Sequence, residues 1–236
     1  MKEIRTLRAD EIDCRVSQIA SNWLTLLLYK NARVDMDILD ETFGVMNWKR
    51  EHKRDNANCV VSIWNDEIKE WVSKEDTGTE SFSEAEKGLA SDSFKRACVN
   101  IGIGRELYTS PTIFILPRKD MAKKGNENEF FDKGNGKFDT KTRFYVEYID
   151  YDDNRRIKDL IIRDNKNNVR FSELTKETEQ ELNKKMLEFK KLVEKKEETE
   201  DWDRTKLYEY YKVENDGQLT LKQIDEIIKL LKKKGE

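Results

Sequence analysis

The sequence is poor in the residues on which common enzymatic sites depend. Its 236 residues include one histidine, His52, and three widely separated cysteines, Cys14, Cys59 and Cys98. A single histidine leaves no HExxH motif and no Ser/His/Asp triad with a spare base, so the commoner hydrolytic sites are excluded. An odd, scattered set of cysteines is typical of reduced thiols rather than of a disulfide framework or a zinc site. We therefore expect a non-catalytic protein without a metal or other cofactor.

Long apolar runs and an excess of charge of one sign are also missing. The longest apolar run, WLTLLLY at residues 23–29, is far too short to span a bilayer, and residues 1–13 are charged rather than apolar. We therefore expect a soluble cytoplasmic protein with no membrane partner. The 45 Lys and Arg residues nearly cancel the 48 Asp and Glu residues. Because no overall positive field results, any nucleic-acid site must be local.

Hydrophobic periodicity predicts an α+β fold. Residues 4–22 carry apolar side chains at helical spacing and predict a helix, TLLLYK predicts a buried strand, and VDMDILDETFG predicts a short helix that ends at Gly44. Period-two alternation predicts three strands in NWKREHKR, CVVSIWN and KEWVSKE, and a long helix follows them. This order differs from the strand-helix alternation of a parallel nucleotide-binding sheet. We expect a sheet packed on the long helix.

The long helix, within EAEKGLASDSFKRACVNIGIGRELY, combines a basic pair with two glycines. Ser83 and Glu86 have the spacing of a capping box at its start. Gly102 and Gly104 fall at its end, whereas the glycines of a phosphate-binding loop precede a helix, so a phosphate loop is excluded. One apolar stripe predicts the face that packs on the sheet. Its members are Ala90, Phe94, Ala97, Cys98 and Ile101.

The second half of the chain predicts more strands and then helices. RFYVEYIDY, RIKDLIIRD and NVRFS predict a β-meander that either extends the first sheet or forms a small separate one. The stretch LNKKMLEFKKLVEKKEETE predicts a charged, solvated linker helix, and LTLKQIDEIIKLLKKK predicts a helix that begins with Thr220 and Gln223 in capping-box register. We divide the chain into an N-terminal core (1–116), a flexible loop (117–140), a meander that extends the core (141–173), a charged helix (174–200) and a small helical C-terminal region (201–236).

Three fragments of the first half, IDCRVSQ, YKNARVDMDILDETFGVMNWKRE and SDSFKRACVNIGIGRELY, together resemble the Rad fifty-two superfamily of single-strand annealing proteins, particularly its short phage and bacterial members. The fragments occur in the family order. The resemblance implies a curved antiparallel sheet packed on a long helix, and homo-oligomeric rings or filaments that hold single-stranded DNA in an outer groove. It also implies ATP-independent annealing in recombination and repair, in the cytoplasm of a bacterial host cell.

Carried over by position, the resemblance also implies DNA-binding residues. Lys95 and Arg96 correspond to the basic pair at the groove floor, Arg15 to a second backbone contact, and Tyr29 to an aromatic contact. Where some relatives have a further arginine, this chain has Val99, so part of the groove chemistry is weaker or is supplied elsewhere. The loop EDTGTESFS is shorter than in eukaryotic relatives and lacks their basic residue.

Each of these residues also has an ordinary structural explanation. On pattern alone, Lys95 and Arg96 are typical of a solvated helix face. Arg15 can pair with a neighbouring carboxylate, and Tyr29 is as consistent with a core position as with a DNA contact. A further basic cluster favours an outer DNA contact, although charge on an edge strand also prevents aggregation. Its members are Lys49, Arg50, Lys53 and Arg54.

Three functions remain open on the sequence. The first is annealing, in which weak phosphate contacts repeated around an oligomer hold single-stranded DNA and the annealed duplex. The second is a protein-interaction adaptor that acts through the C-terminal helices, whose apolar stripe is otherwise internal packing; a host single-strand binding protein is one candidate partner. The third is protection of DNA ends without annealing.

Overall fold

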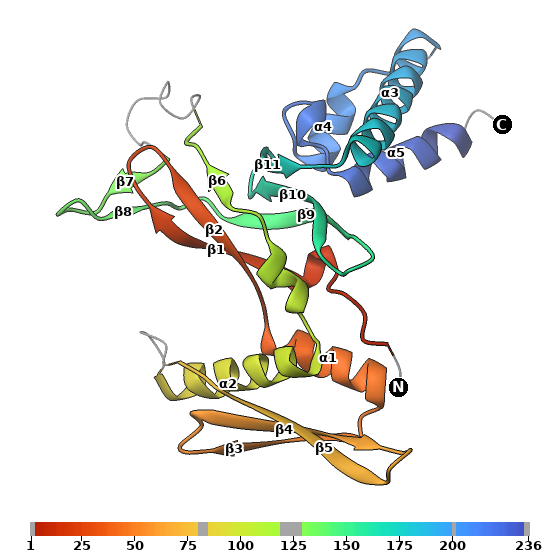
Figure 1. Ribbon diagram of the computed structural model, residues 1–236. Coiled ribbons are helices and arrows are strands. Elements are labelled where there is room, and N and C mark those ends of the chain that lie inside the picture. The colour runs from red at the N-terminus through yellow and green to blue at the C-terminus, as the bar shows by residue number, and fades with distance from the viewer. Residues whose placement is uncertain (1–2, 80–84, 119–128, 200–201, 234–236) are drawn as a thin grey trace. The chain divides into compact units, whose positions relative to one another are not determined.

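The chain folds into two compact units. The computed structural model describes residues 3–79, 85–118, 129–199 and 202–233 (Figure 1). The first unit contains residues 1–13 and 28–110, and the second contains residues 14–27 and 111–236. Helices and antiparallel strands occur in both, which confirms the predicted α+β class. The units do not follow the division suggested by the sequence, because residues 14–27 leave the first unit to join the strands of the second.

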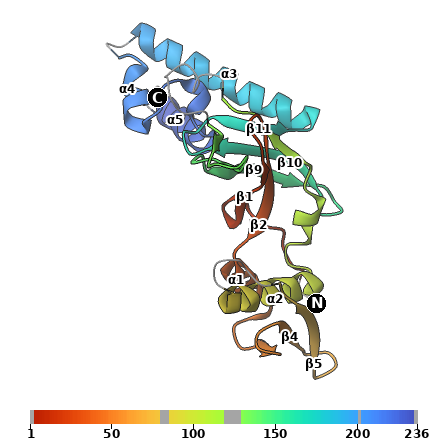
Figure 2. The ribbon, with the colours of Figure 1, turned by 90° about the vertical axis from the view of Figure 1, so that its left-hand side faces the viewer.

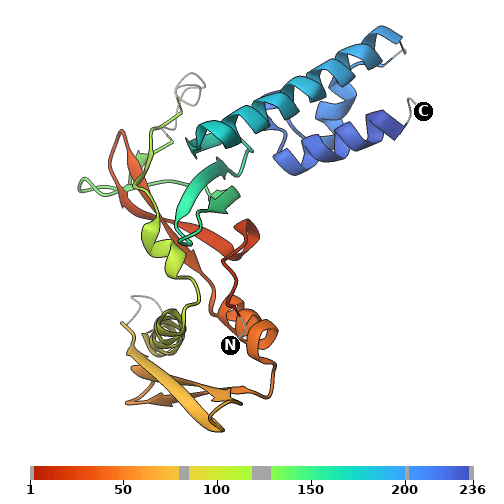
Figure 3. The ribbon, with the colours of Figure 1, turned by 45° about the vertical axis from the view of Figure 1, so that its right-hand side comes forward.

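The first unit is built on a three-stranded antiparallel sheet. Its strands are β3 (Trp48–Lys53), β4 (Asn58–Asn65) and β5 (Glu70–Thr77), paired in that order. The helix α2 (Ala85–Ile101) lies across one face of this sheet, and α1 (Ala32–Phe43) packs beside α2 (Figures 1 and 3). These two helices and three strands confirm the elements predicted between residues 32 and 101. The short 3-10 helix Arg105–Thr109 follows α2.

The core of the first unit lies between α1, α2 and the sheet. The predicted stripe of α2 faces inward, with Phe94 in the middle of it. The Trp48 ring stacks on Phe94 at 6.3 Å between centroids, and the Trp48 indole N–H donates to Asp40 of α1 at 2.6 Å. These contacts fix both helices on one face of the sheet. The residues of this core that are fully buried are Ile38, Leu39, Cys59, Val61, Phe94, Ala97 and Cys98.

The helix predicted over residues 4–22 is wrong. The segment contains a one-turn 3-10 helix, Ala9–Glu11, followed by the strand β1 (Ile12–Ile19). Of the apolar residues that suggested a helix, Ile12 is buried but Val16 is 36% exposed, so they do not form one packed face. The strand instead takes its partners from β2 (Leu24–Lys30) and a strand far along the chain. Tertiary pairing overrides a weak local pattern here.

The second unit is built on a six-stranded sheet in the order β11-β10-β9-β1-β2-β6. The predicted meander is present as β9 (Phe144–Tyr151), β10 (Ile157–Asp164) and β11 (Val169–Glu173), and it joins β1 rather than the β3-β4-β5 sheet. The strand β6 (Ile113–Ile115) forms the other edge. Within the predicted loop 117–140, residues 119–128 lie outside the described part of the chain. The rest includes a short hairpin of β7 (Phe131–Asp132) and β8 (Phe138–Asp139), with Phe130 buried.

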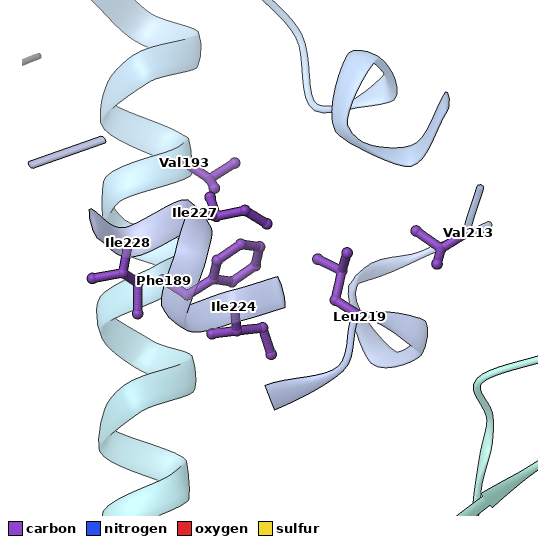
Figure 4. Packing of buried hydrophobic residues seen from close by; sticks show 7 residues of the cluster. All are labelled: Phe189, Val193, Val213, Leu219, Ile224, Ile227 and Ile228. Atoms are coloured by element: carbon purple, nitrogen blue, oxygen red, sulfur yellow. The ribbon is translucent and has the colours of Figure 1, made fainter. Parts of the chain in front are cut away.

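Three helices form a C-terminal module within the second unit. They are α3 (Lys176–Thr199), α4 (Thr205–Tyr211) and α5 (Leu221–Lys233), and α3 and α5 lie side by side (Figure 3). Phe189 and Val193 of α3 are buried against α5, so α3 is not the solvated linker helix that its charge predicted (Figure 4). The predicted capping box of α5 is confirmed. Thr220 N donates to Gln223 Oε1 at 2.8 Å and Gln223 N donates to Thr220 Oγ1 at 3.3 Å.

Figure 2 shows the helices of this module beside the strands of the meander, and buried ionic groups attach the two. Arg163 of β10 is 5% exposed, and its Nε lies 2.5 Å from Glu147 Oε2 of β9. The same guanidinium donates to the carbonyls of Gly217 at 2.8 Å and Leu219 at 3.1 Å, just before α5. Glu147 Oε1 accepts from the Leu221 N–H at 2.7 Å. The ion pair therefore also satisfies backbone groups at the start of α5.

In the described part of the chain, no helix has the length and apolar character needed to cross a membrane.

Candidate nucleic-acid interface

Lys95 and Arg96 occupy the part of α2 that turns away from the buried stripe. Phe94, Ala97 and Cys98 are fully buried, which fixes the rotation of the helix about its axis. The Lys95 side chain is then 28% exposed and the Arg96 side chain 46% exposed. The capping box predicted at Ser83 and Glu86 falls outside the described residues and side chains. The helix therefore presents the two cations from adjacent positions on a packed, rigid element.

Carboxylates lie beside both cations. Arg96 Nε donates to Asp76 Oδ1 of β5 at 3.3 Å, and Asn100 Nδ2 donates to the other oxygen of Asp76 at 3.2 Å. Lys95 Nζ lies 4.0 Å from Asp92 Oδ1, one turn earlier on α2. Both pairs are partly exposed, so each contributes only about 0–1 kcal/mol to stability. A phosphate group could replace either carboxylate at little energetic cost.

A fully buried ion pair lies in the same unit as this helix face. Lys30 at the end of β2 is 4% exposed, Asp35 of α1 is 0% exposed, and their Nζ and Oδ1 atoms are 2.5 Å apart. Burial raises the pKa of the Asp35 carboxyl to about 6, while the positive charges of Lys30 and Lys95 oppose that rise. Burial also raises the pKa of the Cys98 thiol well above its usual range. Asp35 thus couples electrostatically to Lys95.

Gly104 leaves the space that the Lys30 side chain occupies. Its φ is +73°, and a Cβ atom at this position would lie 2.3 Å from Lys30 Cε. The glycine is therefore required both by its backbone conformation and by the close approach of the buried lysine. The sequence prediction that this glycine follows the helix end is confirmed, since α2 ends at Ile101.

The basic cluster on β3 is divided between two faces of the sheet. Arg50 faces α2, where its guanidinium carbon lies 4.8 Å from the centroid of the Phe94 ring. Lys49 and Lys53 face the opposite side, as the predicted alternation requires. Arg54 lies beyond the strand, in a turn, with φ of 50°. These four residues therefore do not form one continuous contact surface, and only Arg50 lies on the face that α2 covers.

Arg15 and Tyr29 are both on strands. Tyr29 is 36% exposed and alternates on β2 with the buried residues Leu28 and Lys30, so it is not a core tyrosine. Arg15 is an exposed residue of β1 rather than of a helix end. Arg15 belongs to the second unit, whereas Lys95, Arg96 and Tyr29 belong to the first.

Two exposed cations of the first unit, Lys74 and Arg105, were not among the candidate DNA contacts predicted from the sequence. Lys74 of β5 aligns across β4 with Arg50, on the face that α2 covers. The alternation within KEWVSKE could have indicated it. Arg105 donates from Nε to the carbonyl of Val99 and from Nη2 to that of Asn100, both at 2.8 Å. Its guanidinium therefore lies at the end of α2, close to Val99.

In the described ranges, no three His, Cys, Asp or Glu side chains gather closely enough to hold a metal ion. No protein-family model matches this chain, and neither does any curated protein or solved structure compared with it. The chemistry of the residues themselves is therefore the basis for a functional assignment.

Proposed function

We propose that this protein binds single-stranded DNA and anneals complementary strands without ATP, as a homo-oligomer in the cytoplasm of a bacterial host cell. The observation that carries the proposal is the pair of cations on α2, each beside a carboxylate that a phosphate can replace. The resemblance of the first half of the chain to single-strand annealing proteins supports the same assignment. Annealing needs no nucleophile, because no covalent bond forms or breaks.

Backbone contacts suit this activity because they do not depend on base sequence. Lysine and arginine that bind phosphates position a strand and leave its base edges free for a complement. A few such contacts per protomer, repeated around an oligomer, give tight binding through multivalency. The net charge of −3 is no obstacle, since the phosphate contacts are local. Lys74, Arg50 and Arg105 are exposed cations of the same unit that can extend the contact.

The test replaces Lys95 and Arg96 together with alanine. We expect the Lys95→Ala/Arg96→Ala variant to keep its fold and oligomeric mass, because neither side chain is part of the core. Its affinity for a labelled oligothymidylate should fall at least about tenfold, and the slope of log Kd against log salt should decrease by up to about two. Strand annealing should be lost in parallel.

Two controls make this test specific. Lys190→Ala/Lys191→Ala removes the same charge from an exposed stretch of α3 and should leave DNA binding unchanged. Asp76→Asn removes the carboxylate that holds Arg96 and should raise DNA affinity a few-fold. If the Lys95/Arg96 variant is folded and anneals normally, these two residues are not the site.

A specific observation favours the adaptor function as a second candidate. The C-terminal module contains a hollow of about 530 Å³, a size typical of ligand-binding sites. Tyr210 and Leu230 line it and are 78% and 57% exposed. The charged side chains of the lining are Lys196, Lys229 and Glu226. A host single-strand binding protein remains the candidate partner.

The third candidate function, protection of DNA ends, would use the same α2 surface as annealing and would differ only in excluding a second strand.

A further inference from the structure

The face of the β3-β4-β5 sheet that α2 does not cover carries two tryptophans. Trp64 of β4 and Trp71 of β5 are directly opposite in the register, and their ring centroids are 5.5 Å apart at an interplanar angle of 66°. Trp71 is 40% exposed. Figures 1 and 3 show α2 on the other face of this sheet and, among the described elements of the first unit, nothing over this one.

A lysine and two serines form the neighbouring row on the same face. Lys49, Ser62 and Ser73 align across the three strands. Lys49 Nζ lies 4.3 Å from the centroid of the Trp71 ring, and the two serine hydroxyls are 2.8 Å apart. The patch therefore combines exposed aromatic surface, one cation and hydroxyl groups. We call these five residues the tryptophan platform.

We propose that the tryptophan platform stacks one or two bases of unpaired nucleic acid, as a site separate from Lys95 and Arg96. The inference rests on the proposed DNA-binding function and adds a second surface to it. A base lying on the exposed face of Trp71 takes the position of the Lys49 ammonium group, which moves to the adjacent phosphate. Such stacking is independent of sequence, because every base has a π face.

The charged residues around the platform limit where a nucleic-acid strand can contact this face. Glu51 and Glu75 form part of the next row on the same face, and Asp66, which accepts the Trp64 indole N–H, lies at the opposite end of the platform. These carboxylates repel a phosphate backbone that runs along the strands, so a bound strand contacts this face beside its lysines, Lys49 at the platform and Lys53 two rows further along β3. Base faces rather than phosphates therefore supply most of the contact, which distinguishes this site from the cationic surface of α2.

A cross-strand tryptophan pair also stabilises a sheet, so the test must separate stacking from folding. Trp64 has a structural role, since its indole N–H donates to Asp66 at 3.0 Å. Trp71 is the more exposed of the two and is the residue to change. Trp71→Ala removes the stacking surface, and Trp71→Phe keeps an aromatic ring there. Phe114→Ala is the control, because Phe114 is also an exposed ring paired with a tryptophan, Trp23, but lies on β6.

The probes are a labelled oligothymidylate and an abasic oligomer of the same length. We expect Trp71→Ala to bind oligothymidylate about 5- to 100-fold more weakly than the wild type, and to bind the abasic oligomer equally well. Trp71→Phe should retain most of the affinity. A structural defect would weaken the binding of both probes alike, so equal losses of affinity for the two probes overturn the proposal.

The remaining outcomes separate this inference from the function on which it rests. If Trp71→Ala matches the wild type on both probes while Lys95→Ala/Arg96→Ala loses binding, the platform is not a nucleic-acid site but the proposed function stands. If Trp71→Ala changes the oligomeric mass and leaves both affinities intact, the face is an interface between copies and the inference fails. If the wild type does not bind oligothymidylate even at low salt, both proposals fail.

Discussion

Among single residues, Asp35 shows how burial changes the pKa of a carboxyl group that is already paired with a lysine. Its carboxylate is fully buried with the Lys30 ammonium, and the positive charge of Lys95 also acts on it. The pairing offsets only part of the cost of taking both ions out of water. The direction of the pKa change reflects this, because a carboxyl in a strong and fully compensating ion pair would have a lowered pKa rather than one of about 6.

This pKa predicts an unusual dependence of stability on pH. Between about pH 4 and pH 6 the native state binds the Asp35 proton more tightly than the unfolded chain, whose carboxyl has the ordinary pKa of 3.8. Acidification through that window therefore stabilises the fold with respect to this group, by at most about 3 kcal/mol. We expect the free energy of unfolding of the wild type, relative to Asp35→Asn, to increase from pH 7 to pH 4.5. Urea titrations at both pH values measure it.

The exposed Asp37 on the same helix provides the control. Asp37→Asn should keep the pH dependence of the wild type, because the buried pair of Lys30 and Asp35 is intact in it. A wild type that loses stability relative to Asp35→Asn on acidification would contradict the argument. It would show that the ion pair with Lys30 dominates over desolvation.

The residues of the candidate site differ in how far the sequence could predict them. The apolar stripe of α2 was sufficient to place Lys95 and Arg96 on the outer face, because a helix has one period and one buried side. The partners of these residues were not predictable. Asp76 comes from β5, twenty residues earlier, and only the register of α2 on the sheet brings it to Arg96. Similarly, the Trp64–Trp71 contact depends on a strand register that alternation alone does not give.

Among the elements, α3 and β1 show where local pattern is an insufficient guide. The charge of α3 predicted a solvated helix, but Phe189 and Val193 provide a narrow stripe that α5 covers. Such a narrow apolar stripe carries little information until its partner is known. In the strand β1 the apolar residues fit helical spacing by chance, and one of its two pairing partners, β9, lies more than a hundred residues away in the sequence. Elements that were periodic over their full length, such as α1 and α2, were predicted correctly.

Arg163 and Glu147 connect β10 and β9 to the start of α5, and we call this pair the joint. A mutation in the joint is expected to destabilise α5 strongly and locally. Arg163→Met leaves the Glu147 carboxylate buried without its cation and leaves the Gly217 and Leu219 carbonyls without a donor. Breaking such a buried pair costs about 3–5 kcal/mol. We expect amide hydrogen exchange across residues 221–233 to accelerate at least about a hundredfold, with exchange in α2 unchanged. Mass spectrometry of peptic peptides measures both.

A second variant separates the charge from the geometry of this joint. Adding Glu147→Gln to Arg163→Met removes the uncompensated charge but keeps an acceptor for the Leu221 N–H. We expect the double variant to recover part of the protection of residues 221–233 against amide exchange. Comparison with the two single variants then gives the coupling energy between the two positions. If Arg163→Met exchanges like the wild type, the joint does not hold the module on the meander.

For the whole molecule, the joint changes how the competing functions can be separated. Truncation near Ser172 would remove both α5 and the backbone groups that Arg163 and Glu147 satisfy, so a loss of function in the fragment could reflect misfolding. Point variants avoid this difficulty. Lys95 and Arg96 lie in the first unit and the hollow of the C-terminal module lies in the second, so each can be changed without touching the core of the other.

The two functions therefore predict opposite patterns in two variants. Leu230→Glu places a carboxylate in the hollow, and Leu230 is exposed enough for the change to leave the fold intact. If the protein is an annealing factor that recruits a host single-strand binding protein, Leu230→Glu should anneal bare DNA normally but bind that partner at least about tenfold more weakly. Lys95→Ala/Arg96→Ala should do the reverse. Calorimetry with the purified partner and a fluorescence annealing assay measure the two activities.

If Leu230→Glu abolishes annealing of bare DNA while its oligomeric mass is normal, the hollow belongs to the DNA-binding machinery and the two functions are not separable.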